Sequence, residues 1–268
     1  MLYEVMKKAG LSLYKLLRFE DASKYLTEDI NSFKSVIVFA VPYYCGIEGG
    51  NISLYARGED YHVVLKRRAQ LVIDELQADV NVNFSIYTDN SPFKEVKLAA
   101  ASGLGLIGKN GLLITKDYGS FVFIGEILTD MLFDEYDSLS EILKCENCGL
   151  CIEKCPGGAL SGHNFDKTLC VSGVTQKKGE LSKTETDLIK NSLTIWGCDI
   201  CQIVCPHNKD IFETDLIEFK GNRIKNIFES DVKFLTNKTF KEKYKNRAFT
   251  WRGVEPFKRN TKINFEAK

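Results

Sequence analysis

Long apolar runs are absent from this chain of 268 residues. No stretch approaches the roughly 18 apolar residues that a membrane-spanning helix requires, so we expect no membrane contact. An excess of one charge is also absent, because 36 Lys and Arg residues balance 36 Asp and Glu residues, and overall charge therefore indicates no partner. The N-terminal pattern over residues 1–17 is that of a charged amphipathic helix and not of a signal peptide. These absences favour a cytoplasmic protein.

Cysteine is concentrated in one stretch, which holds eight of the nine cysteines. The first run has the spacing C-x₂-C-x₂-C-x₃-C-P, and the second repeats it without its first cysteine. This spacing is typical of two-cluster ferredoxins, in which the fourth cysteine of each run ligates the other [4Fe–4S] cluster. The spacing therefore predicts two sets of ligands. One set is Cys145, Cys148, Cys151 and Cys205, and the other is Cys155, Cys170, Cys198 and Cys201.

Two other interpretations of the cysteines fit the spacing less well. Structural zinc sites use paired C-x₂-C knuckles, usually without a C-x₃-C-P ending. A disulfide framework is typical of short secreted chains, and this chain is neither short nor secretory in pattern. Cys45 lies outside both runs, and we expect it to be a buried, inert thiol.

The rest of the chain divides by pattern into three parts. Residues 1–140 alternate helical and strand patterns, which indicates an α/β layer. Residues 141–210 form the cluster segment, and residues 211–268 form a basic helical tail. From His207 onward the chain has fifteen Lys and Arg residues against nine Asp and Glu residues. We expect strands over residues 35–41, 83–87 and 121–128, and helices over residues 1–17, 60–78 and 93–102.

An aspartate directly follows one of these strands. Asp89 stands in Thr-Asp-Asn-Ser-Pro at the end of the 83–87 strand, a position where α/β folds build their sites. A simpler interpretation is that Asp89 caps the helix beginning near Pro92. The glycine-rich segment 101–114 follows, but it has neither Walker spacing nor the order of a dinucleotide fingerprint.

Several segments together resemble the epoxyqueuosine reductases. They are Leu-Tyr-Ala-Arg-Gly-Glu-Asp-Tyr-His over 54–62, Thr-Asp-Asn-Ser-Pro over 88–92, Ala-x-Gly-Leu-Gly-x-Ile-Gly-Lys-Asn over 101–110, Gly-Ser-Phe-x-Phe-x-Gly-Glu over 119–126 and both cysteine runs. The resemblance covers roughly residues 35–260 in one order. It implies an enzyme related to the reductive dehalogenases that reduces epoxyqueuosine to queuosine in tRNA. The fold it implies is an α/β (α+β) cobalamin-binding domain with an inserted or appended ferredoxin-like two-[4Fe–4S] module and a short helical tail.

The resemblance also implies cofactors and residue roles. Two clusters would relay electrons to cobalamin, and the proton donor would be Asp89, whose pKa burial beside an apolar corrin face would raise. Cobalamin contacts would be Ser172 and Asp199 beside the clusters, with Tyr55, Lys109, Asn110 and Ser120 on the α/β side. No histidine is expected to ligate cobalt: His62 lacks the glycine of a cobalamin box, and His163 and His207 have no supporting context.

Partners follow from the same resemblance. The basic tail, with its interleaved aromatic residues, favours tRNA as partner through phosphate contact and base stacking. We expect a monomer that takes electrons from a reductant such as flavodoxin or ferredoxin. Two alternatives stay open: a related reductase acting on another small electrophile, and an electron-transfer protein that binds no cobalamin. The chain is also shorter than many family members, which have a further helical-repeat extension.

Overall fold

The chain folds into two compact units in this computed structural model, which describes residues 2–30, 33–77, 82–161 and 164–265. The first unit comprises Met1–Pro42 and Tyr61–Glu146, and the second comprises Tyr43–Asp60 and Asn147–Lys268. Within the described ranges, no helix is both long and apolar enough to cross a membrane. The three-part division at residues 140 and 210 stays a prediction, although the segment 211–268 shares its compact unit with most of the cluster segment.

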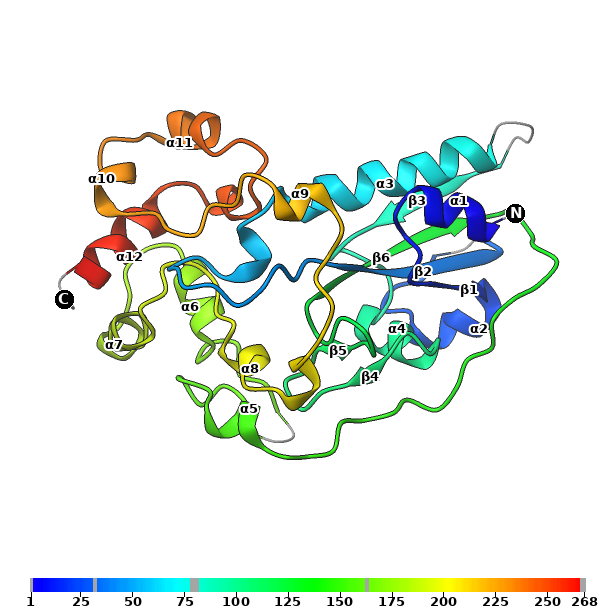
Figure 1. The fold of residues 1–268 in the computed structure, drawn as a ribbon, viewed down its shortest axis with the longest axis horizontal. Helices are drawn as coiled ribbons and strands as arrows, with labels where there is room; N and C mark the ends of the chain where they lie inside the picture. Colours follow the sequence, from blue (N-terminus) through cyan, green and yellow to red (C-terminus); the bar gives the residue numbers. More distant parts are fainter. Residues whose placement is uncertain (1, 31–32, 78–81, 162–163, 266–268) are drawn as a thin grey trace. The chain divides into compact units, whose positions relative to one another are not determined.

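The first unit is built on an antiparallel sheet in the order β1-β2-β6-β3 (Figure 1). Its strands are β1 (Tyr14–Arg18), β2 (Ser35–Pro42), β3 (Phe84–Tyr87) and β6 (Val122–Thr129). Strand β2 is apolar on both faces because it lies inside the sheet and is buried along nearly its whole length. The mixed α/β class is therefore confirmed, with strands β2, β3 and β6 close to their predicted bounds.

Helices cover both faces of this sheet (Figure 1). Helix α3 (Tyr61–Leu76) lies on one face, and α4 (Glu95–Ala101) lies on the other with α2 (Phe19–Ala22). On the α4 face, Leu98 packs in one apolar cluster with Val38 and Leu128. The other face needs a glycine, because a Cβ on Gly125 would stand 2.6 Å from the ring of Phe39.

The N-terminal helix is shorter than predicted. Helix α1 is Leu2–Lys8, and the chain then turns through Gly10, whose φ of 72° lies in the left-handed region. Residues 14–17 of the predicted helix instead belong to strand β1, whose five residues pair with β2. The apolar residues at 16 and 17 satisfied a helical period, but sheet pairing decided their conformation.

The glycine-rich segment forms a small hairpin. Strands β4 (Leu106–Ile107) and β5 (Leu113–Ile114) pair around a turn at residues 108–111. Gly105 allows the close approach, because a Cβ there would stand 2.3 Å from the carbonyl oxygen of Ile114. Ile107 also bridges to Lys144 in parallel, so the hairpin holds the chain just before the first cluster cysteine.

The second unit is a set of short helices around an aromatic core. Trp196 stacks on Phe257 at 5.0 Å between ring centroids, and Phe240 and Phe249 complete the fully buried group. Its described α-helices are α5 (Leu150–Glu153), α6 (Val171–Gln176), α7 (Lys183–Ser192), α8 (Ile200–Ile203), α9 (Ile217–Lys220), α10 (Glu229–Val232), α11 (Asn237–Lys243) and α12 (Glu255–Phe265). The basic tail is thus part of a packed core and is not a solvated appendage.

Candidate functional site

Asp89 lies in the loop directly after β3 and is held by two aromatic side chains of α3. The hydroxyl of Tyr61 donates to its carboxylate, and Nε2 of His62 lies 3.0 Å from the same oxygen. The backbone of Asp89 has a φ of 66°, a left-handed conformation that aspartate tolerates better than most residues. Helix α4 begins only at Glu95 with Lys94 as its N-cap, so the helix-capping interpretation of Asp89 is wrong.

Tyr61 is itself fixed by stacking. Its ring lies 4.1 Å from that of Phe123 on β6, with an interplanar angle of 4°. Burial raises the pKa of the Asp89 carboxyl, but hydrogen bonds from His62 and Tyr61 outweigh it and leave that pKa below its usual range. The predicted rise in the pKa of Asp89 is therefore absent in this conformation, in which the side chain keeps 53% of its exposure.

Two further carboxyl groups lie behind Asp89. Glu95 begins α4, and one oxygen of its carboxyl group, Oε1, is buried without a hydrogen-bond partner among the described residues. Burial and the charge of Asp89 raise the pKa of Glu95 to about 7. Glu126 lies on β6 with no exposed surface, and burial together with the charge of Glu95 raises its pKa well above the usual range. The three carboxyl groups thus interact electrostatically within the first unit.

The hairpin of the first unit brings together two of the predicted cobalamin contacts. Lys109 and Asn110 lie in its turn, and the backbone N–H of Lys109 donates to Sγ of Cys145 at 3.4 Å. The ammonium of Lys109 makes no ion pair with any described residue. Ser120 is buried just before β6. A backbone donor to a cluster sulfur raises the reduction potential of the cluster by stabilising the more negative state.

The other predicted contacts lie in the second unit. Oδ1 of Asp199 accepts from the Ser53 hydroxyl at 2.5 Å, and Oδ2 accepts from the backbone N–H of Leu54 at 2.8 Å. Tyr55 accepts from Nε1 of Trp196 at 2.9 Å. Asp199 therefore fixes the 53–55 segment against the second cysteine run. Burial raises the pKa of Asp199, while Ser53 and Leu54 oppose the rise.

Ser172 lies on α6, next to Cys170. Its hydroxyl and carbonyl oxygens accept from the Gln176 amide at 3.2 Å and 3.1 Å. Thr175 of the same helix accepts from the backbone N–H of Gly197, which precedes the second cysteine run. These bonds tie α6 to that run within the second unit. They leave the Ser172 hydroxyl able to donate one hydrogen bond.

The predicted second cluster set is close together in this unit. The pKa of Cys201 is raised to about 12, first by burial and then by the neighbouring thiols of Cys198, Cys170, Cys155 and Cys151. Burial, with Asp199, Cys170 and Cys155, raises the pKa of Cys198 to about 11. Cys155 and Cys170 are therefore electrostatic neighbours of both Cys198 and Cys201, but Cys151 of the other set is also a neighbour of Cys201. The assignment of cysteines to the two clusters stays a prediction. Binding iron releases these protons, because metal ligands must be thiolates.

All nine cysteines are free thiols. Among the described residues, no three Cys, His, Asp or Glu side chains converge closely enough for a single metal ion. A four-iron cube is larger than one ion and holds its four thiolates further apart. The lack of a single-ion site among the described residues is therefore compatible with the predicted clusters. Cys45 lies apart, 3.5 Å from the carbonyl oxygens of Tyr43 and Phe219, and burial raises its pKa.

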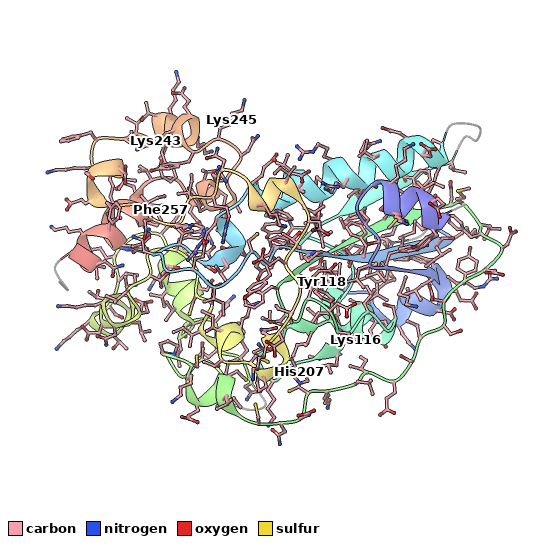
Figure 2. The ribbon with its side chains drawn as sticks, in the orientation of Figure 1. Lys116, Tyr118, His207, Lys243, Lys245 and Phe257 are labelled. Carbon is pink, nitrogen blue, oxygen red and sulfur yellow. The ribbon has the colours of Figure 1, made fainter. Side chains whose placement is uncertain are left out.

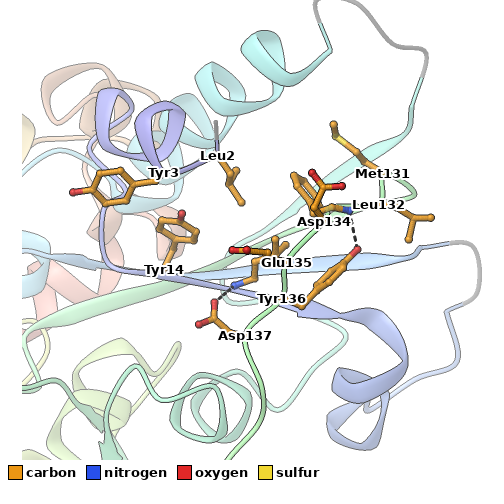
Figure 3. A pocket seen from close by; sticks show the side chains of 11 residues that line it. Leu2, Tyr3, Tyr14, Met131, Leu132, Asp134, Glu135, Tyr136 and Asp137 are labelled. Carbon is orange, nitrogen blue, oxygen red and sulfur yellow. Dashed lines mark hydrogen bonds between the residues drawn. The ribbon is translucent and has the colours of Figure 1, made fainter.

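A cavity of about 650 Å³ lies elsewhere on the first unit (Figure 3). Tyr3, Tyr14 and Tyr136 line it together with Asp134 and Glu135. Lys15 pairs with Asp137 at its edge at 2.7 Å. None of the predicted site residues lines this cavity, and its acidic side chains would repel a phosphate-bearing ligand.

Fewer basic and aromatic side chains of the tail are available to contact nucleic acid than its composition indicates. Phe249 is fully buried, Tyr244 is 6% exposed, and Arg247 donates to the carbonyl oxygens of Arg57 and Asn222. Trp251 remains 58% exposed with the Arg252 guanidinium 3.7 Å above its ring. In Figure 2, Lys243 and Lys245 lie at the surface of the second unit, whereas Phe257 points into its core.

Sequence reasoning missed the residues that surround Asp89. Tyr61 and His62 were noted only as part of a motif, with His62 expected on the helix surface or hydrogen-bonded. A polar pair at the start of a helix gives no sign of its distant partner. Glu126 carried a stronger signal, because a glutamate inside an apolar strand must be paired or neutral. His163 lies outside the described residues, and no pKa or contact links His207 to the site.

Comparisons with known proteins agree with this geometry. Residues 144–208 match the family described as 4Fe-4S double cluster binding domain, which confirms the cluster prediction for this segment. Residues 25–90 match the family described as Epoxyqueuosine reductase QueG, DUF1730. An epoxyqueuosine reductase of Lactococcus garvieae is 36% identical over 79% of this chain. One of Leadbetterella byssophila is 32% identical over 86% of this chain and 77% of its own length.

Solved structures of the same enzymes align over nearly the whole chain. The epoxyqueuosine reductase of Streptococcus thermophilus has a TM-score of 0.82 at 26% identity, covering 99% of this chain and 80% of that one. An epoxyqueuosine reductase in complex with an epoxyqueuosine-modified tRNA stem loop has a TM-score of 0.79 at 25% identity, with the same coverage. A Bacillus subtilis structure, with its catalytic aspartate loop swung out of the active site, matches equally well. This chain spans about three fifths of the length of the first curated relatives that it matches.

Proposed function

The chain belongs to the epoxyqueuosine reductase family, and on this premise we propose that it reduces epoxyqueuosine to queuosine in tRNA. The observation that carries the proposal is the arrangement at Asp89. A carboxyl group at the end of β3 is held by Tyr61 and His62 and interacts electrostatically with the half-buried Glu95 and the buried Glu126. The chain also has a double-cluster segment. Proton delivery and electron delivery are the two requirements of this reduction.

The reaction balances as the removal of one oxygen atom. The epoxide loses both C–O bonds, a C=C bond forms, and the oxygen leaves as water. This consumes two electrons and two protons. The two predicted cysteine sets would hold the clusters, which would supply electrons one at a time, and Asp89 delivers protons to the departing oxygen.

The residues of this chain fit cobalamin as the group at which the epoxide is reduced. Thr88 Oγ1, next to Asp89 in the chain, is buried without a hydrogen-bond partner among the described residues. Within the first unit, Lys109, Asn110 and Ser120 offer hydrogen bonds suited to corrin amides. The contacts proposed in the second unit are Tyr55, Ser172 and Asp199. When bound, cobalamin supplies a reduced cobalt centre that passes electrons from the clusters to the substrate.

Asp89 must lose its present partners to act as an acid. Two hydrogen bonds to the carboxylate favour its charged form, and a carboxylate cannot donate a proton. We place the observed conformation as the resting one, in which Tyr61 and His62 hold the charge. A loop that carries a catalytic aspartate changes position in the Bacillus subtilis relative. Release into a drier, substrate-covered site would raise the pKa of Asp89 and make it an acid.

The partners follow the same proposal. Trp251 with Arg252 above its ring is a surface on which an unstacked base can stack, and the exposed lysines 241 and 245 can contact phosphate. The electron donor is a reductant such as flavodoxin or ferredoxin, and the protein acts as a monomer. Its eight predicted cluster thiolates need a reducing compartment, which supports a cytoplasmic location.

The test is conversion of the modified nucleoside. Anaerobically reconstituted protein, loaded with cobalamin and reduced, is incubated with epoxyqueuosine-containing tRNA, and the digested nucleosides are analysed by mass spectrometry. We expect queuosine to appear, and to depend on both cobalamin and reductant. If cobalamin binds and is reduced but no queuosine forms, the protein is a reductase of another small electrophile. If cobalamin does not bind, the protein is an electron carrier.

A further inference from the structure

Glu126 is a buried glutamate in the centre of the sheet that the steps above leave without a role. It lies on β6 opposite Val38 of β2 and Tyr87 of β3, and none of its surface is exposed. Neither carboxyl oxygen has a hydrogen-bond partner among the described residues. An isolated charge in such a place costs several kcal/mol, so the group holds a proton instead.

Glu95 connects this buried carboxyl group to Asp89. It begins α4, which packs against β6, and one of its carboxyl oxygens, Oε1, is buried without a hydrogen-bond partner among the described residues. The pKa of Glu95, raised to about 7, depends on the charge of Asp89, and the pKa of Glu126 depends on the charge of Glu95. Glu126, Glu95 and Asp89 are therefore linked in this order, from the buried strand to the exposed loop.

Among the residues that the structure describes, no ion pair involves Glu95 or Glu126. Burial and the charge of Asp89 raise the pKa of Glu95, and burial with the charges of Glu95 and Asp89 raises that of Glu126, which Ser91 opposes. From α3, Tyr61 and His62 contact Asp89. At neutral pH the pair therefore holds at least one proton, since two adjacent buried carboxylates repel each other.

We propose that Glu95 and Glu126 form an internal proton store that reprotonates Asp89 within each catalytic cycle, an inference that rests on the proposed function. The reduction consumes two protons, whereas one carboxyl group carries only one. Asp89 gives the first proton to the departing oxygen and becomes a carboxylate. Glu95 then protonates Asp89, Glu126 protonates Glu95, and solvent refills the store through Asp89 after water leaves. Glu95 and Glu126 touch no substrate, so they act through Asp89.

The first experiment detects the stored proton without turnover. Infrared difference spectra of the cluster-containing protein, recorded across pH, should show the C=O stretch of a protonated carboxyl group at neutral pH. Glu126→Gln should remove this band, whereas Glu135→Gln, a change at an exposed glutamate of the first unit, should leave it unchanged. Gln keeps the shape and neutrality of protonated Glu, so folding should be retained. A wild-type spectrum without the band would overturn the store.

The second experiment measures turnover against pH in the cobalamin-loaded protein. Wild-type kcat should fall as pH rises through about 7, where Glu95 loses its proton. Glu126→Gln should lower kcat about 10²-fold with KM unchanged, which is at the low end of what a positioned acid contributes. It should leave the falling limb in place, because a protonated Glu126 and a glutamine are both neutral beside Glu95, whereas Glu95→Gln should remove that limb. Glu95→Gln should lower kcat at least as much.

The outcomes separate the two claims. If the wild-type protein forms no queuosine, the proposed function fails, and the store loses its reaction. If the wild-type protein forms queuosine and both glutamine variants match it in kcat and pH profile, the proton store alone is overturned. If Glu95→Gln lowers kcat but keeps the falling limb near pH 7, the glutamates have a merely structural role, and the proton store is also overturned.

Discussion

Asp89→Asn is the substitution that best distinguishes an effect on the turnover rate from an effect on the free energy of unfolding. Asparagine keeps the shape of the side chain and tolerates the left-handed φ of 66° at this position. It cannot donate a carboxyl proton, and positioned general acids contribute about 10²–10⁴-fold to rate. We therefore expect single-turnover formation of queuosine to slow by about 10²-fold or more, with cluster and cobalamin content unchanged.

The expected stability change is small. Asp89 accepts from Tyr61 and His62, but its side chain is 53% exposed, so solvent screens both interactions. The free energy of unfolding should fall by less than about 1 kcal/mol, the range measured for exposed pairs. Asp130→Asn is a matched control, because Asp130 is another exposed aspartate that follows a strand and bonds Asn83 at 2.7 Å. It should retain the wild-type turnover rate.

The measurement is rapid-quench single turnover with nucleoside quantification, together with iron and cobalamin assays. It distinguishes a lost proton donor from a lost cofactor. A variant that loses cofactor would be uninformative about the proton, which is why both contents are measured on the same sample. Wild-type turnover in an intact Asp89→Asn protein would refute the assignment of Asp89 as proton donor.

Three further predictions concern the hydrogen bonds, the clusters and the tRNA surface. Tyr61→Phe should lower the free energy of unfolding by under about 1 kcal/mol at pH 7, and this difference should vanish as pH falls through the folded-state pKa, since that pKa lies below the unfolded value; denaturation at pH 7 and pH 3 checks it. Cys170→Ala should lower iron from about eight to about four per chain by disrupting one predicted cluster set, and an unchanged iron content would contradict that set. Lys241→Gln and Lys245→Gln should each flatten the slope of log affinity against log salt for tRNA by about 0.7–0.9, whereas Lys66→Gln on α3 should not; equal slopes would remove these lysines from the interface. Arg259 is unsuitable for this test, because it donates to the carbonyl oxygens of Lys177 and Gly179.

Local patterns predicted the parts of the fold that local forces decide. The apolar run at residues 35–41 is buried on both faces and forms β2, and the helical period after residue 60 forms α3. Residues 14–17 were predicted as part of the N-terminal helix, but they pair with β2 as part of strand β1. Antiparallel order between strands distant in sequence leaves no local signature.

The candidate site, like the fold, was predicted from the sequence only where the signal is local in the chain. Cysteine spacing predicted the cluster segment because ligand geometry is local in the chain. The tail illustrates the opposite case, since its aromatic residues indicated base stacking, yet Phe249 and Tyr244 lie in the core with Trp196. Composition cannot tell a buried aromatic ring from an exposed one. The lowered pKa of Asp89 likewise depends on side chains 27 and 28 positions away.

A visible spectrum of the anaerobic protein with added cobalamin, before and after reduction, tests the central claim most directly. The account predicts that one cobalamin binds per chain, that its spectrum differs from that of free cobalamin, and that reduction proceeds through the clusters. Cys170→Ala, which removes one predicted cluster ligand, should slow that reduction. A spectrum equal to the sum of the protein and free cobalamin would contradict the account and leave an electron carrier in its place.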